Sequence, residues 1–513
     1  MDDKIIVSNR SALNAKYGKA GVAKVEAAVS AMIAADRARG LRSRLIYLDN
    51  AAAMKKLKGK PVTLPSNPRQ NKLAIDAVFK ATAPEYLMIL GAPDVVPHQD
   101  LKNLMFQKED DADQFAWGDL PYACDNNYSQ DTTRFKGPTR VVGRLPDLRG
   151  AREPSHLLKL LKIASSYRPR DVKEYARYFG MSTQSWQGST ALSLFNIFGN
   201  SDALLLAPPT APPLRASKLA PLMHFINCHG GAADPHFYGE TRSLKSQPVS
   251  MTSDAIRKKI RLGTVASIEC CYGAELYDSV TLGLPMPICQ RYLEQGAYGY
   301  FGSSTIAYGP ADSNGAADLI TRFFLLAVLE GASLGRAALM ARQRFVEEVH
   351  ELDPVDLKTL AQFSLLGDPS VQPARVPAAD DTPKHADNED IERVKRRDRR
   401  AKLRVQGCYL QETKPTAARK EKGARKSPKV RMALTSIART AGIGAKKEFI
   451  AFGVQRRAAY KTKDTKAAPV ATRYYVALGT PRGRRNEKVN LGVAAVAKEV
   501  KGRIVAYRIY TQR

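Results

Sequence analysis

Short apolar runs and amphipathic stretches alternate along the first 375 residues. Runs of strand length occupy 4–7, 43–49 and 86–90, and apolar residues at helical spacing lie between them at 20–39 and 69–83. Further strand-like runs follow at 139–147, 176–182, 222–229, 265–271 and 298–305. This alternation predicts an α/β fold, with a mostly parallel sheet flanked by helices.

Two of the apolar runs end on reactive side chains. The run LMHFINCHGG ends at His229-Gly230-Gly231, and VASIECCYGA contains Cys271 at the end of its apolar part. Sites in open α/β sheets lie at the carboxyl ends of strands, where a histidine and a cysteine could form a base–nucleophile pair. Either residue alone is more simply structural, because a cysteine at a strand end commonly acts as a small buried hydrophobe. Their combination, in this order, favours a catalytic site.

The composition changes after residue 375. Residues 376–430 are highly charged and poor in large apolar side chains, which predicts a flexible linker. Residues 431–513 regain apolar alternation between Gly, Pro and Lys/Arg turns, which predicts a small all-β domain. We therefore expect a domain at 1–375, with halves at roughly 1–150 and 151–375, followed by the linker and the basic β-rich domain.

Most of the positive charge lies in the last part of the chain. The net charge is +30, and residues 376–513 contain 35 Lys/Arg against 13 Asp/Glu, hence +22. Tyrosines that alternate with arginines there, such as Tyr507 and Tyr510, could stack on nucleic acid. The two faces of a β-sandwich explain the same pattern and are favoured, so a nucleic-acid partner is the weaker interpretation.

Composition narrows the remaining classes of protein. Six cysteines without a CxxC pair give no zinc signature and no disulfide framework, which is typical of a reducing compartment. The start MDDKIIVSNR has no secretory pattern, and the apolar helical stretch at 323–329 is too short to span a membrane. We therefore expect a cytoplasmic protein without a membrane partner. A nucleotide-binding protein is disfavoured because the glycine-rich phosphate motifs are missing.

The motifs together resemble the caspase-like fold of clan CD cysteine peptidases, and most closely its gingipain branch. The resemblance covers roughly residues 1–373. It is carried by five segments in order: VVGRLPD at 141–147, NCHGG at 227–231, ECCYGA at 269–274, FGSSTIAYG at 301–309 and LLGDPS at 365–370.

The resemblance implies a Cys-His dyad without metal or cofactor. Cys271 corresponds to the nucleophile and His229 to its base, with an oxyanion hole formed by the amides of Gly230 and Cys271. Cys270 departs from the small residue usual at its position. Glu269 and Asp234 are candidates for an acid that orients His229, although a structural role is favoured for each.

The resemblance to gingipains also implies cleavage after Arg or Lys, which requires an acid in the substrate pocket. Asp125 and Asp131 precede VVGRLPD at about the expected place, and Asp119 is a weaker candidate. These residues could equally be solvated loop acids. In the segment that walls the family's cleft, Ser303 and Tyr308 are candidate substrate contacts.

These observations predict a cysteine endopeptidase that acts on proteins or peptides. Without a leader it is an intracellular relative of the gingipains, expected to be a zymogen in a bacterial protease cascade with an upstream activating protease or regulator. The basic run KRRDRR at 395–400 could be a site of self-processing. The alternative is an inactive caspase-like scaffold whose basic C-terminal domain binds nucleic acid or an anionic partner.

Overall fold

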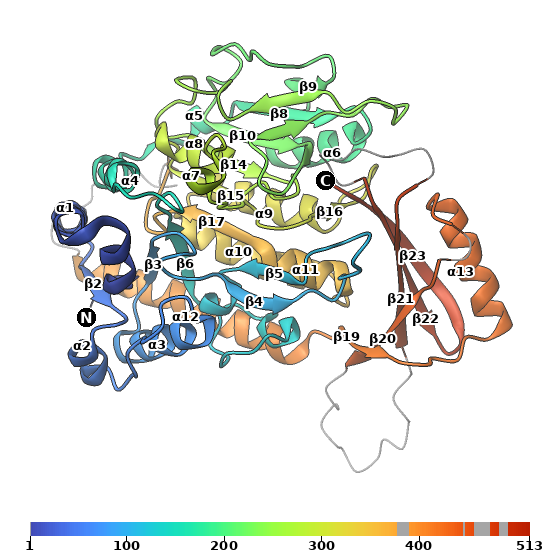
Figure 1. Cartoon of the computed structure of the whole chain (residues 1–513), viewed down its shortest axis with the longest axis horizontal. Helices are drawn as coiled ribbons and strands as arrows, with labels where there is room; N and C mark the ends of the chain where they lie inside the picture. Colours follow the sequence, from blue (N-terminus) through green and yellow to red (C-terminus); the bar gives the residue numbers. More distant parts are fainter. Residues whose placement is uncertain (1, 377–388, 445–446, 456–471, 482–490) are drawn as a thin grey trace.

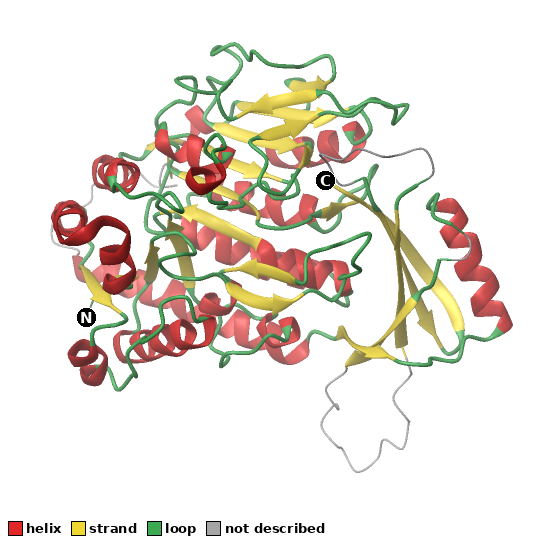
Figure 2. Cartoon of the chain, viewed as in Figure 1, coloured by secondary structure: helices red, strands yellow, loops and turns green. Residues whose placement is uncertain are grey.

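Two sheets organise the computed structural model, one of ten strands and one of six (Figure 1). The structure describes residues 2–376, 389–444, 447–455, 472–481 and 491–513. Helices surround the large sheet, and one helix lies along the outer side of the small sheet (Figure 2). No helix in these ranges is long and apolar enough to cross a membrane.

The large sheet consists of two parallel blocks. Every neighbouring pair is parallel except β15 with β17, so five strands run one way and five the other. This arrangement confirms the mostly parallel sheet. The strand order is β2 (Ser43–Tyr47), β1 (Lys4–Ser8), β3 (Tyr86–Leu90), β6 (Val141–Leu145), β17 (Phe363–Gly367), β15 (Gly299–Ser303), β14 (Val265–Ile268), β10 (Met223–Asn227), β8 (Tyr178–Thr183) and β9 (Leu204–Ala207).

Both faces of the large sheet are buried, which is why its strands are apolar throughout. In β10, Met223 and Phe225 belong to one apolar cluster, whereas Ile226 belongs to another. The first cluster includes α6 (Gln187–Phe198), α9 (Ala317–Leu329), α10 (Leu334–Glu348) and α11 (Pro354–Gln362). The second includes α1 (Arg10–Ala38), α2 (Ala51–Lys56), α3 (Pro68–Thr82), α4 (Ser155–Ser166) and α8 (Ile288–Glu294).

Part of the expected linker is helical. Residues of α12 (Glu389–Thr413) form a helix, which differs from the flexible segment expected over 376–430; residues 377–388 lie outside the described part. The few apolar side chains of α12 explain its docking. Leu403 packs on a buried cluster of Leu41, Tyr86, Val141 and Leu339, and Leu410 is fully buried.

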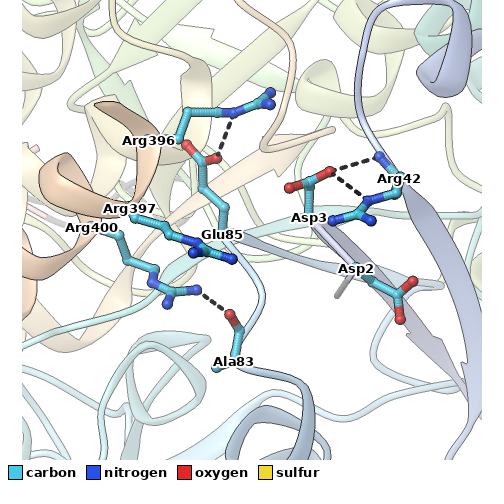
Figure 3. A pocket seen from close by; sticks show the side chains of 8 residues that line it. All are labelled: Asp2, Asp3, Arg42, Ala83, Glu85, Arg396, Arg397 and Arg400. Atoms are coloured by element: carbon cyan, nitrogen blue, oxygen red, sulfur yellow. Dashed lines mark hydrogen bonds and ion pairs between the residues drawn. The ribbon is translucent and has the colours of Figure 1, made fainter. Parts of the chain in front are cut away.

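Charged contacts fix the first half of α12 to the N-terminal block (Figure 3). Arg396 Nε lies 3.8 Å from a Glu85 carboxylate oxygen, and Arg400 donates to the backbone carbonyl of Ala83. These arginines belong to the basic run at 395–400, which is therefore helical and paired. A peptidase binds its substrate in extended form, so this run is poorly presented for cleavage.

The six-stranded antiparallel sheet joins the two parts of the chain. The expected C-terminal β sheet is present, and it also contains β16 (Tyr308–Gly309) from the first 375 residues. Helix α13 (Pro428–Thr440), which the strand pattern did not predict, packs on this sheet through Val430, Leu434 and Ile437. The other strands are β19 (Thr416–Glu421), β20 (Ile450–Gln455), β21 (Thr472–Gly479), β22 (Val493–Val500) and β23 (Arg503–Gln512).

Candidate active site

Cys271 lies at a tight turn just after β14. The next residue, Tyr272, has φ of 54°, a left-handed conformation that non-glycine residues rarely adopt. Its amide donates to the carbonyl of Thr305 at 3.0 Å. Cys270 points into the apolar core, where its sulfur accepts from the Cys228 amide at 3.4 Å. The turn thus separates the two thiols, and Cys271 belongs to a different cluster, next to the C-terminal sheet.

His229 follows β10 and forms the short strand β11 (His229–Gly230). Its Nε2 lies 3.4 Å from a carboxylate oxygen of Glu240, and both side chains are fully buried. Ser185 Oγ donates to the same Glu240 oxygen at 2.6 Å. The ring of Trp186 meets the imidazole edge-on, with 4.4 Å between centroids. The histidine is therefore held by an acid and an aromatic ring.

The two acids that the sequence offered for orienting His229 lie in other contacts. Asp234 accepts from Tyr238 Oη at 2.8 Å and pairs with His236. Glu269 accepts from Thr321 Oγ1 at 3.0 Å. Glu240 was missed because it lies in a polar loop, where nothing in the sequence distinguishes it from a solvated acid.

The backbone of Arg513 occupies the space beside Cys271. The Arg513 carbonyl oxygen accepts from the Cys271 amide at 2.9 Å and from the Gly230 amide at 3.5 Å. The Arg513 amide in turn donates to the carbonyl of Ala307 at 3.0 Å. A Cβ at Gly230 would come within 2.0 Å of the Cys271 carbonyl oxygen, so only glycine permits this approach. The two amides named from the sequence thus bind one oxygen atom.

The side chain of Arg513 fills a buried pocket, here called the guanidinium pocket. Its Nη2 donates to the two carboxylate oxygens of Asp318 at 3.1 and 3.2 Å and to the Pro310 carbonyl at 2.7 Å. The guanidinium carbon lies 4.5 Å from the centroid of the Trp186 ring. A Cβ at Gly309 would lie 2.2 Å from Nη2, so this glycine provides the space. Arginine suits this combination of carboxylate and aromatic face.

Sequence reasoning missed Asp318 and Trp186, although one signal was available. Asp318 lies in the first turn of α9, in the otherwise apolar segment ADLITRFFLLAVL, and it is fully buried. A lone acid at the start of an apolar helix requires a buried partner. Trp186 comes just before α6 and had no comparable signal.

Glu269 and Asp318 form a buried pair of carboxyl groups. Burial and the neighbouring Asp318 carboxylate raise the pKa of Glu269 well above its usual value. Burial also raises the pKa of Asp318, against the opposing charge of the Arg513 guanidinium. Two carboxyl groups beside one cation are most stable with a single negative charge. We infer that Glu269 is neutral and that Asp318 is ionised.

The acids expected in the substrate pocket lie elsewhere. Asp125 accepts from Arg140 Nε at 2.9 Å, and Asp131 caps a short 3₁₀ helix through the Thr133 amide at 3.0 Å. Asp119 forms a bidentate pair with Arg144, whose charge offsets burial and lowers the pKa of Asp119. None of these contacts involves Arg513 or the residues around it.

Ser303 and Tyr308 do lie beside the site. Ser303 Oγ donates to the Cys270 carbonyl at 2.9 Å and so supports the turn that carries Cys271. Tyr308 pairs along the backbone with Gln512, and its hydroxyl accepts from Gln512 Nε2 at 3.0 Å. Tyr308 therefore contacts the residue that precedes Arg513.

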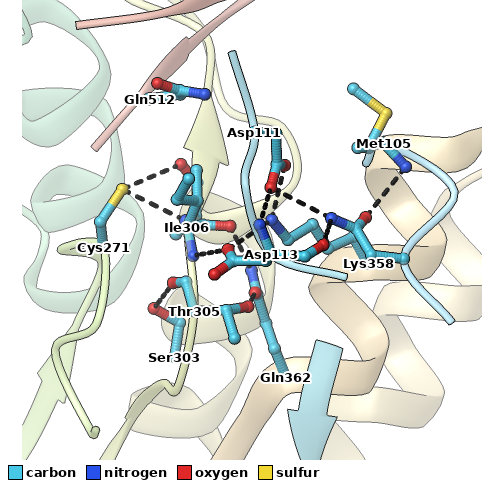
Figure 4. Close-up of polar contacts among 12 residues, drawn as sticks. Met105, Asp111, Asp113, Cys271, Ser303, Thr305, Ile306, Lys358, Gln362 and Gln512 are labelled. Carbon is cyan, nitrogen blue, oxygen red and sulfur yellow. Dashed lines mark hydrogen bonds and ion pairs between the residues drawn. The ribbon is translucent and has the colours of Figure 1, made fainter. Parts of the chain in front are cut away.

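A buried charged network supports this wall of the site (Figure 4). Lys358 Nζ lies 2.6 Å from Asp111 and 3.0 Å from Asp113. Asp113 accepts from Tyr272 Oη at 2.9 Å and from the Ile306 amide at 2.8 Å. The network links the Cys271 turn to the segment before β16, because one carboxylate bonds both.

The thiol of Cys271 is protonated in this closed arrangement. Burial raises its pKa to about 12, although the Ala307 backbone opposes this. The Ala307 amide donates to Sγ at 3.3 Å, and Sγ lies 3.5 Å from the Ala307 carbonyl oxygen. Among the described residues, no group of three metal-ligating side chains gathers here or elsewhere.

Comparisons with known proteins gave two distant structural matches. No protein-family model matches the chain, and no curated protein matches it. A solved structure described as "Structure of Protease" is similar at a TM-score of 0.48 and 13% identity, over 99% of this chain and 97% of that chain. The Saccharomyces cerevisiae separase–securin complex matches at a TM-score of 0.28 and 15% identity, over 45% of this chain and 14% of that chain.

Proposed function

We propose that the chain is a cysteine endopeptidase, with Cys271 as nucleophile and His229 as its base. One observation carries the proposal. A backbone carbonyl, that of Arg513, accepts hydrogen bonds from the Cys271 and Gly230 amides directly beside a cysteine thiol. This is the arrangement that a peptidase needs around a scissile carbonyl.

The proposed chemistry uses only side chains of this chain. His229 takes the thiol proton, and Glu240 stabilises the resulting imidazolium through Nε2. The thiolate attacks the carbonyl carbon, and the oxyanion is stabilised by the two amides at roughly 3 kcal/mol per donor. His229 then protonates the leaving amine, and water hydrolyses the acyl-enzyme.

We further propose cleavage after arginine in preference to lysine. The pocket next to the thiol contains a carboxylate, a carbonyl acceptor and an aromatic face around a planar cation. Lysine could pair with Asp318 as a point charge, but it would lose the planar contact with Trp186. Asp318 thus takes the role that the sequence assigned to Asp125 or Asp131.

An active-site label tests the proposed function. The full chain is incubated to completion with a peptidyl-arginine chloromethylketone, and the modified residue is located by mass spectrometry. We expect the adduct on Cys271 and its loss in Cys271→Ala and in His229→Ala. Cys270→Ala is the matched control and should be labelled like the wild type. An adduct on Cys270, or labelling that persists in His229→Ala, would contradict the proposed dyad.

A further inference from the structure

The last strand of the chain ends inside the candidate active site. Thr511 and Gln512 of β23 pair antiparallel with Gly309 and Tyr308 of β16, and Arg513 follows directly. Figure 1 shows the C-terminus next to β16, within the molecule. Arg513 is fully buried. Residues 511–513 are therefore a built-in part of the site.

The pairing has the geometry of a bound substrate. An extended peptide that adds to a strand edge is a common mode of peptide recognition, in which the backbone bonds give affinity and pockets select side chains. Here the backbone bonds to β16 continue through the Arg513 amide to Ala307. The side chain enters the guanidinium pocket, and the carbonyl meets the two amides. Arg513 thus occupies the place of the residue before a scissile bond.

We propose that residues 511–513 are an intramolecular substrate mimic that keeps the peptidase latent until they are displaced. This proposal rests on the proposed function for the word peptidase, but the occupancy itself does not. It assigns a ligand class to the site: an extended peptide segment with arginine in the guanidinium pocket, read by Asp318 and Trp186. A substrate and the Arg513 segment cannot bind together, because both need the same oxygen site.

Tethering makes the mimic a strong competitor. A segment joined to its site by a short chain acts at an effective concentration of order millimolar, far above that of ordinary protein substrates. β23 is also held by β22 along its length, with Thr511 opposite Val493. The Gln512 amide donates to the Gly492 carbonyl at 2.9 Å. Residues 512–513 can leave without unpairing the rest of β23, because their bonds lie beyond Thr511.

Substitution of Arg513 tests the proposal in the full-length chain. Arg513→Ala removes the guanidinium contacts and leaves the backbone of β23 intact. Charged hydrogen bonds of this kind correspond to about a ten- to hundredfold change in occupancy. We expect the rate of Cys271 labelling by the arginine ketone to rise by about that factor. Arg503→Ala, at the exposed start of the same strand, is the matched control and should label like the wild type.

A binding measurement separates this proposal from the proposed function. The probe is a fluorescent peptide of sequence Tyr-Thr-Gln-Arg, added to Cys271→Ala and to Cys271→Ala combined with Arg513→Ala. We expect saturable binding to the double variant only, and competition by an unlabelled arginine peptide but not by its alanine analogue. Binding without any labelling or cleavage would support the mimic and refute the peptidase.

Two outcomes would overturn the mimic. One is equal labelling of wild type and Arg513→Ala, which would leave the peptidase standing. The other is equal peptide binding to both Cys271→Ala proteins. If Arg513→Ala does not melt cooperatively, Arg513→Gln takes its place, because glutamine keeps most of the length and removes the charge. Equal labelling of wild type and Arg513→Gln would then reject the proposal.

Discussion

At the scale of single residues, the site depends on buried charges that balance one another. Arg513, Asp318 and Glu269 are fully buried, and their charges balance only if the two carboxyl groups share one proton. Buried groups of this kind cost free energy unless each is paired. The protonation state of Glu269 is therefore a property of the folded chain that solution measurements can detect.

Glu269 should make the protein less stable as pH rises. Its pKa is raised in the folded state, so the unfolded chain ionises it first, and folding then takes up a proton. The stability from neutral Glu269 is complete below its unfolded pKa of about 4.3 and is lost between that value and the folded pKa. The loss amounts to at most about 1.4 kcal/mol per pH unit.

Glu269→Gln removes this dependence, because an amide mimics the neutral acid. Denaturant unfolding at pH 5 to 8 should show the variant gaining on the wild type as pH rises. Other groups titrate in both proteins and largely cancel in the difference. A difference that stays flat over this range would mean that Glu269 is ionised in the folded chain.

At the scale of elements, strands could be predicted from the sequence but partners across the fold could not. The ends of β10 and β14 were found because a buried strand is a local pattern, and His229 and Cys271 came with them. Glu240, Trp186 and Asp318 reach the site from a loop, a helix start and α9, far apart in sequence. The register of β16 on β23, which brings in Arg513, depends on backbone pairing between distant segments. Single-sequence periodicity contains no such information.

The β16 strand itself yields a test of the guanidinium pocket. Gly309→Ala places a methyl group where Nη2 now lies, because the added Cβ would come within 2.2 Å of it. We expect labelling of Cys271 by the arginine ketone to fall by about tenfold or more. Labelling by iodoacetamide, which needs no pocket, should not fall. Gly444→Ala is the control, since no atom lies within 4 Å of its added Cβ. An unchanged arginine preference in Gly309→Ala would rule out this pocket as the specificity site.

At the scale of the whole molecule, the catalytic part and the C-terminal sheet share one core. Met105, Ile306, Tyr308 and Val355 from the first 375 residues pack in the same cluster as the apolar face of the C-terminal sheet. That face consists of Ala417, Phe452, Tyr474, Val476, Leu478, Ala494, Val496 and Tyr510. The sequence suggested separable domains because composition changes at 376. The shared cluster could not be predicted, since each side reads as an ordinary buried face.

Fragment 1–375 should therefore fold poorly alone. Removing the sheet exposes at least four large side chains at about 2 kcal/mol each, which is comparable to the net stability of a typical domain. We expect the fragment to aggregate or to melt without cooperativity, and co-expression with 389–513 to restore a soluble complex. Solubility and near-UV circular dichroism of both preparations measure this. A monomeric 1–375 fragment that melts like the full chain would show that the two parts are independent. In that case the C-terminal sheet would serve only to deliver Arg513 to the site, since the catalytic part would not need it to fold.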